Sequence, residues 1–427
     1  MKGKKVALLL IVLGVLLVVF LIQVYSFPLF GNYINTDNKK VVIHIWTIHG
    51  DVEDALKEIL DQYEETHPGI TFDITVYKNE VYQIAVNNAM LTDSLPDMFF
   101  MWGYSKLKRF VDSGMALDIT DLVEKNNLPA AIMENKLDAF TFDNRIYGLP
   151  LYGWTASLFC NREIFQQYGL SYPKNYNQFM EVCKELKSQG EIPVITGGKE
   201  GWLSSLYFMS LVQGEGPGNS IFQASRDPER FYDLQYINAT EKLGSMIKQN
   251  IWQNDYLECD AYNASYQFSQ GKGAMLYYGS WATTLLEGKT SKVKGKVDVI
   301  DFPNNENREG IGGYVDTFVI NKEGVIGKDD ELVQMYIDVM KAVSDKIVNE
   351  KGGGIPVYKH QVVDKSKYPL LYKCWDLNKD RTLYPAYDQI MSEELSERYY
   401  YILNEFMANE ITDQEFIEQL SKPLINN

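Results

Sequence analysis

Residues 268–281 read FSQGKGAMLYYGSW, the pattern of a helix end, a glycine turn, a short strand and a second turn. The two glycines of the Gly-Lys-Gly turn permit the backbone geometry that a tight helix-to-strand connection needs. The apolar run 274–278 is too short for a helix and is typical of a buried strand. Trp281 follows this strand. Because open α/β sheets bind ligands at the carboxyl ends of their strands, Trp281 is a candidate ligand platform; the alternative is a core tryptophan after an ordinary turn.

Strands and helices alternate along the rest of the chain. Residues 41–46 (VVIHIW) are β-branched and apolar, which favours a central strand of a parallel sheet. Apolar residues recur at helical spacing over 52–63, and 70–76 alternates as a strand does. Further strands are predicted at 98–102, 154–161, 297–302 and 318–320, with a polar loop at 303–310. This alternation predicts an α/β fold, and 427 residues exceed the usual size of one core, so we expect two domains.

The composition excludes some partners and favours others. A net charge of -16 argues against a nucleic-acid partner, because its phosphates would be repelled. The chain holds 29 Tyr, 20 Phe and 7 Trp, and such side chains suit surfaces that stack on planar or sugar-like ligands, although large cores use them too. The four cysteines lie far apart without a C-x-x-C pair, so we expect buried free thiols rather than disulfides.

The first 40 residues are expected to lie outside the fold. Three lysines precede the apolar stretch 6–22, which is the pattern of a secretory signal or of an uncleaved membrane anchor. No small-x-small cleavage site follows and no cysteine is present for a lipid anchor, so we favour the uncleaved anchor. In both cases the positive end stays inside and the body of the protein is exported.

Five segments in this order resemble the family 1 extracellular solute-binding proteins, the sugar-capturing subunits of bacterial ABC importers. They are the strand ending in Trp46 before a turn and helix, Leu95-Pro96-Asp97 before an apolar strand, Tyr147–Pro150 followed by 154–161, the stretch 268–281, and Gly354–Pro356 with the helix start at 410–412. Two features depart from the family. Members from Gram-positive bacteria commonly carry a lipoprotein cysteine, and Gly273 stands where the family more often has alanine, a change that the turn tolerates.

The resemblance implies a two-lobe periplasmic-binding-protein-like fold, in which α/β lobes joined by a hinge close on a ligand in the cleft between them. Each lobe is discontinuous in sequence in this family. Carried over to this chain, lobe one would hold residues 41–150 and 314–350, and lobe two would hold 151–313 and 351–427. Residues 1–40 would be the signal or anchor and a linker.

The resemblance also implies a set of ligand-binding residues in the cleft. Indoles cover the C–H faces of sugars, and carboxylates bind their hydroxyl groups. The tryptophans at family cleft positions are Trp281, Trp154, Trp202 and Trp102, while Trp46 is expected to be scaffold. Polar candidates are His49 and Asp51 in the first strand-to-helix loop, and Tyr314 and Asp316 after the Gly-Gly crossing. The alternative for Asp51 is a helix N-cap.

The function implied is capture of a carbohydrate, an oligosaccharide because several indoles are available for separate rings, and its delivery to the membrane permease of an ABC importer. We expect an exported, monomeric protein at the membrane, with no cofactor or metal site. An exported glycoside hydrolase is a rival, but no acidic pair, G-x-S-x-G or metal-ligand spacing supports an enzyme. A binder of another solute, or a ligand sensor, would use the same architecture.

Overall fold

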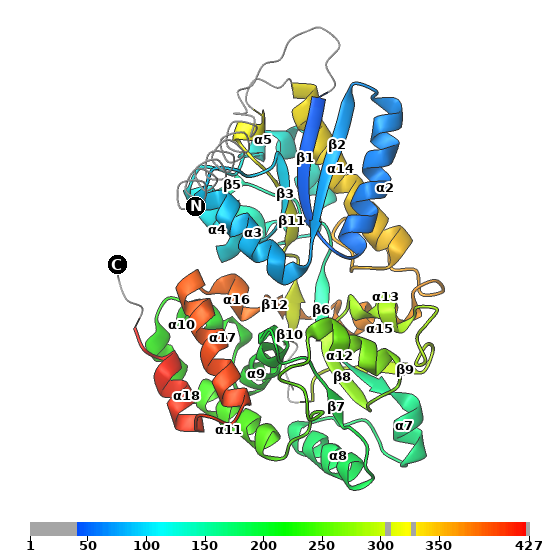
Figure 1. The fold of residues 1–427 in the computed structure, drawn as a ribbon, viewed down its shortest axis with the longest axis vertical. Coiled ribbons are helices and arrows are strands. Elements are labelled where there is room, and N and C mark those ends of the chain that lie inside the picture. Colours follow the sequence, from blue (N-terminus) through cyan, green and yellow to red (C-terminus); the bar gives the residue numbers. More distant parts are fainter. Residues whose placement is uncertain (1–40, 304–308, 326–329, 424–427) are drawn as a thin grey trace, which may run out of the picture.

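The computed structural model describes residues 41–303, 309–325 and 330–423, which form two lobes one above the other (Figure 1). The predicted signal or anchor segment lies outside the described residues. Within the described part of the chain, no helix combines the length and apolar character needed to cross a membrane.

Lobe one, the upper lobe in Figure 1, is built on a four-stranded sheet in the order β11-β3-β1-β2. β1 runs parallel to β2 and β3, whereas β11 is antiparallel to β3. The strands are β1 (Val41–Ile48), β2 (Ile70–Tyr77), β3 (Met98–Trp102) and β11 (Asp316–Ile320). The helices are α2 (Asp51–Thr66), α3 (Asn79–Leu91), α4 (Ser105–Asp112), α5 (Thr120–Lys125), α6 (Leu128–Ala131) and α14 (Asp330–Asp345), beside the hairpin β4 (Thr141–Phe142) and β5 (Arg145–Ile146).

Lobe two is built on a six-stranded sheet in the order β12-β10-β6-β8-β7, with β9 also paired to β6. Its strands are β6 (Trp154–Asn161), β7 (Val194–Ile195), β8 (Met275–Gly279), β9 (Val297–Ile300), β10 (Glu309–Gly313) and β12 (Thr382–Tyr384). Its helices are α7 (Arg162–Gln167), α8 (Tyr176–Ser188), α9 (Trp202–Glu215), α10 (Ile221–Ala224), α11 (Leu234–Lys248), α12 (Ala261–Ser269), α13 (Ala282–Leu286), α15 (Pro369–Asn378), α16 (Tyr387–Ile390), α17 (Glu393–Met407) and α18 (Asp413–Leu420). β10 begins inside the stretch predicted as a polar loop, which corrects that prediction.

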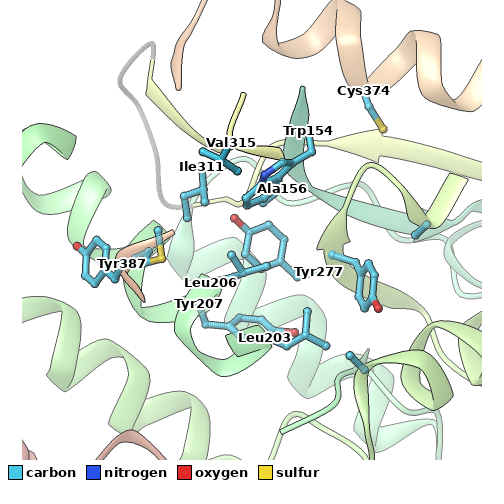
Figure 2. Close-up of a cluster of buried hydrophobic side chains, with 14 of the residues drawn as sticks. Trp154, Ala156, Leu203, Leu206, Tyr207, Tyr277, Ile311, Val315, Cys374 and Tyr387 are labelled. Carbon is cyan, nitrogen blue, oxygen red and sulfur yellow. The ribbon is translucent and has the colours of Figure 1, made fainter. Parts of the chain in front are cut away.

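The core of lobe two surrounds α9, which is buried on every side from Leu203 to Gln213. A helix that is apolar all round cannot lie on a surface, so it fills the space between the sheet and the outer helices. Figure 2 shows Leu203, Leu206 and Tyr207 of α9 close to Tyr277 of β8, and the Tyr207 and Tyr277 rings lie 5.3 Å apart. The predicted free thiols are confirmed for the four cysteines, all buried and unpaired: Cys160, Cys183, Cys259 and Cys374.

Residues 268–281 fold as predicted into a helix end, a turn and the buried strand β8. Gly271 has φ 78°, the left-handed conformation that favours glycine. A Cβ on Gly273 would lie 2.6 Å from Cγ1 of Ile195. The departure from the alanine of the family therefore makes room for Ile195 of the neighbouring strand β7.

Three crossing segments join the lobes: residues 147–153, 314–315 and 352–368. The first segment is hydrogen-bonded to the third, because Gly153 N donates to Ile355 O (3.0 Å), and to the start of β11 beside the second, because Leu151 N donates to Asp316 O (2.9 Å). The third segment also pairs with lobe one, where Met133 N donates to Val357 O (2.9 Å). The predicted two-lobe α/β architecture is confirmed, while the exact residue bounds predicted for each lobe (41–150 with 314–350, and 151–313 with 351–427) stay a prediction.

Candidate ligand-binding site between the lobes

Four aromatic residues of lobe two form one cluster, which we call the indole cluster: Trp154, Trp202, Tyr278 and Trp281. Trp281 lies at its centre, with ring centroids 5.1 Å from Trp154, 5.8 Å from Trp202 and 5.7 Å from Tyr278. The structure thus brings together three of the four predicted tryptophans. Tyr278 was missed as a site residue, although it lies in the apolar run of the stretch 268–281.

The Gly-Ser-Trp turn after β8 explains how Trp281 reaches this place. A Cβ on Gly279 would lie 2.2 Å from Cη2 of Trp281, so only glycine lets the indole fold back over the strand end. Ser280 fixes the turn to β6, because its N–H donates to Thr155 O (2.8 Å) and its hydroxyl accepts from Thr155 N (3.2 Å). Gly279 and Ser280 together therefore place the Trp281 indole next to Trp154, the first residue of β6.

The members of the indole cluster differ in exposure. Trp154 and Tyr278 are buried, with 6% and 5% of their surface exposed, while Trp202 and Trp281 are half-buried. Stacking on a ligand requires an accessible ring face. Trp202 and Trp281 are thus the two rings of the cluster that keep accessible surface, while Trp154 and Tyr278 pack against Trp281 from within the core.

Two carboxylates lie near the indole cluster and hold α12 in place. Asp260 caps the helix, with Oδ1 accepting from Asn263 N at 2.7 Å, and Glu200 Oε2 accepts from Ala261 N at 3.2 Å. Both carboxylates, together with burial as the larger cause, raise the pKa of Tyr278. Tyr278 therefore stays a neutral phenol that can donate and accept hydrogen bonds.

In lobe one, Trp102 ends β3 and is half-buried. It packs edge-on against Phe100 (5.1 Å) and Tyr82 (6.0 Å). Its cross-strand partner is Asp316, the first residue of β11. Trp46 contacts Tyr77 within the same lobe. Among the described residues, no ring contact connects Trp102 with the indole cluster. The rings around Trp102 belong to lobe one, and the indole cluster belongs to lobe two.

Asp51 and Asp316 meet the crossing segments. Asp316 is 6% exposed, and burial raises its pKa to about 7, although a hydrogen bond with Tyr152 opposes the shift. Burial, and next the charge of Asp54, raise the pKa of Asp51 to about 6. Burial first, and then the negative charges of Asp316 and Asp51, raise the pKa of Tyr152. On the other side of Asp51, a Cβ on Gly353 would lie 2.4 Å from its Oδ2.

The remaining predicted residues have different surroundings. Asp51 is not the N-cap of α2, because Gly50 occupies that position, and this corrects the alternative considered for Asp51. His49 is exposed and bonded through Nδ1 to Glu53 (2.7 Å). The Tyr314 ring packs over Gly153 and lies beneath Lys136, whose Nζ is 4.0 Å from the ring centroid.

Metal ligands are not grouped in the described part of the chain, where no three His, Cys, Asp or Glu side chains are placed to hold an ion together. The polar side chains already described at the junction of the lobes are the carboxyl groups of Asp51 and Asp316 and the phenol of Tyr152. Such groups are suited to hydrogen bonds with hydroxyl-bearing ligands.

Known proteins are similar to this chain in sequence and in fold. Residues 49–338, well over half of the chain, match the family described as bacterial extracellular solute-binding protein. A multiple sugar-binding protein of Streptococcus mutans is 22% identical over 282 residues, a match that spans 64% of this chain and 64% of that protein, less than two thirds of its length.

Solved structures share the fold. One, from work on xylan utilization by the thermophilic bacterium Caldanaerobius polysaccharolyticus, has a TM-score of 0.82 at 23% identity and covers 89% of this chain and 99% of its own. A chitin oligosaccharide binding protein has a TM-score of 0.81 at 20% identity, covering 90% and 97%. The family match and the two-lobe fold together lead to one conclusion: this chain belongs to the bacterial extracellular solute-binding proteins.

Proposed function

We propose that this protein binds an oligosaccharide between its lobes and delivers it to the membrane permease of an ABC importer. The observation that carries the proposal is the indole cluster, in which two half-buried tryptophan rings are held in place beside carboxylates. Rings and carboxylates are the two kinds of group that sugars require, for their C–H faces and hydroxyl groups respectively. The names of the Streptococcus mutans relative and of the chitin oligosaccharide binding protein support a sugar as the ligand.

Each predicted residue receives a role in this proposal. Trp281 and Trp202 stack on sugar rings from lobe two, supported by Trp154 and Tyr278. Asp51 and Asp316 bind hydroxyl groups at the base of the cleft, and Trp102, His49 and Tyr314 contribute the facing surface. Closure of the two lobes would bring both sets of groups onto the ligand.

A thermal-shift screen tests the proposal, because a ligand that binds the native state raises the melting temperature. The screen compares oligosaccharides with peptides and small anions on the purified exported part, residues 41–427. We expect stabilisation by at least one oligosaccharide series. Stabilisation by peptides or anions, with none by oligosaccharides, would contradict it.

We further propose that the protein acts as an exported monomer without catalytic turnover, held at the outer face of the cytoplasmic membrane by residues 1–40. The expected results are recovery in the membrane fraction, a monomer in light scattering, and no new reducing ends after incubation with the bound sugar. New reducing ends would instead establish a glycoside hydrolase.

A further inference from the structure

Two tyrosines emerge together from the solvent-facing side of α12. Tyr262 and Tyr266 are 67% and 44% exposed, the ring centroids lie 6.5 Å apart, and the ring planes differ by only 12°. They are four residues apart, so both side chains leave the same face of the helix. In the described structure these rings contribute little to the core, and they stand nearly parallel to each other at the surface.

A chain of contacts connects this tyrosine pair with the indole cluster. The hydroxyl of Ser265 donates to the carbonyl of Tyr262 (2.8 Å), and the Ser265 side chain is also hydrogen-bonded with Tyr278. Tyr278 in turn contacts Trp202 at 5.5 Å and Trp281 at 5.7 Å. α12 packs against α13, which begins directly after Trp281, and both helices lie on the side of lobe two that faces lobe one (Figure 1). The pair is therefore carried by the helix whose buried face contacts the indole cluster.

The helix that carries the pair is held firmly at its first turn. Asp260 accepts from both the backbone N–H and the side-chain amide of Asn263, each at 2.7 Å, and Glu200 accepts from the N–H of Ala261. Rigid rings cost less conformational entropy on binding than mobile ones. These carboxylates at the start of α12 also supply acceptors for hydroxyl groups near the rings.

We propose that Tyr262 and Tyr266 form an outer subsite for the sugar units of an oligosaccharide that extends beyond the indole cluster. This inference rests on the proposed function and adds to it a requirement for chain length. Two parallel ring faces suit successive pyranose units, whereas a monosaccharide or disaccharide bound at Trp281 would not reach them. Affinity should therefore rise with the length of the sugar chain, and the tyrosine pair should supply part of the rise.

Isothermal titration of residues 41–427 tests this inference. The probes are xylo-oligosaccharides and chito-oligosaccharides, from the disaccharide to the hexasaccharide. In the double variant Tyr262→Ala/Tyr266→Ala we expect the affinity for the longest chain that binds to fall about 3- to 10-fold, while the affinity for the disaccharide is unchanged. Tyr262→Phe/Tyr266→Phe keeps the rings and should retain the affinity. Tyr401→Ala removes an exposed tyrosine of α17 (64% exposed) and serves as the matched control.

Each other result has a distinct meaning. An equal loss of affinity at every chain length would show that the pair acts through Tyr278, and would overturn the inference. Unchanged affinity at every length in the double variant would overturn it as well. If the unsubstituted protein binds none of the oligosaccharides, the proposed function itself is wrong. This result is obtained before any variant is measured, so the two failures are distinguishable.

Discussion

Trp281 is the residue on which the proposed function depends most. Its ring contacts three other aromatic rings, yet the residue is only half-buried. In Trp281→Ala we expect sugar affinity to fall about tenfold or more, because stacking is lost and the neighbouring rings lose their support. The melting temperature should fall only slightly, because the indole is half-buried.

Trp375→Ala is the matched control for this prediction, since Trp375 is a half-buried tryptophan of lobe two that packs on Tyr372, outside the indole cluster. It should leave sugar affinity unchanged. If Trp281→Ala unfolds the protein or leaves the affinity intact, Trp281 is a core residue and the stacking role is wrong.

Asp316 makes stability depend on pH. Its pKa in the folded protein is about 7, above the ordinary value of a carboxyl group, so the folded state holds the proton more tightly than the unfolded state does. The free energy of unfolding should therefore rise as the pH falls from 7 toward 4, by at most about 1.4 kcal/mol per pH unit for one proton.

Chemical denaturation of the ligand-free protein at several pH values measures the slope of the unfolding free energy against pH. Asp316→Asn should remove much of it, and Asp51→Asn a smaller part, because the pKa of Asp51 is raised only to about 6. Asp364→Asn should leave the slope unchanged, because hydrogen bonds with Ser366 lower the pKa of Asp364 and it titrates below this range. A slope that Asp316→Asn does not alter would contradict the assignment.

At the scale of elements, the turn between β8 and α13 depends on Gly279. In Gly279→Ala the new Cβ would meet the ring of Trp281 at 2.2 Å, so the indole must move away from Trp154. We expect a stability loss of about 1–3 kcal/mol together with weaker sugar binding. Tryptophan fluorescence and titration check both effects.

Gly69→Ala offers the control, because Gly69 has nothing within 4 Å of the position where a Cβ would lie. It should change neither measurement. Full sugar affinity in Gly279→Ala would show that the position of the indole does not control binding.

Elements with a local signal were predicted well from the sequence, and those held by distant partners were not. The boundaries of β3 (Met98–Trp102) and β6 agree with the prediction, because an apolar run between breakers carries its signal within a few residues. β10 reads EGIGG, which has weak strand propensity. It is a strand because β6 and β12 pair with it from both sides, and the sequence of β10 does not show which strands are its partners.

The candidate site shows the same limit. The positions of the tryptophans followed from family motifs, but the burial of Asp51 depends on Gly353, which lies about 300 residues away in sequence. Likewise Tyr152 was missed because its contact with Asp316 forms only where the first crossing segment meets the start of β11. Sequence patterns locate such residues but do not show which of them meet.

At the scale of the whole molecule, the lobes also touch away from the crossing segments, where α4 of lobe one lies over α16 and α17 of lobe two (Figure 1). The contact is mainly polar, with one ring contact between Tyr104 and Phe222, whose centroids lie 6.3 Å apart. Arg109 pairs with Glu393 at 2.8 Å, and the hydroxyl of Ser105 donates to the carbonyl of Gln389 at 2.6 Å. Polar groups exchange their partners for water at little cost, so most of this contact can open with little loss of apolar packing.

Glu393→Gln should therefore change the arrangement of the lobes more than the stability of the fold. A partly exposed ion pair contributes about 1 kcal/mol or less to stability. A free energy of this size shifts a melting curve only slightly, but it changes the equilibrium constant between two lobe orientations about fivefold. Small-angle scattering of the ligand-free protein should show a larger radius of gyration in Glu393→Gln, and the same increase at high salt in the unsubstituted protein. Lys108→Gln breaks a pair with Asp112 within α4 and should change neither, since that pair does not join the lobes. An identical radius in Glu393→Gln and the unsubstituted protein would mean that the crossing segments alone fix the lobes.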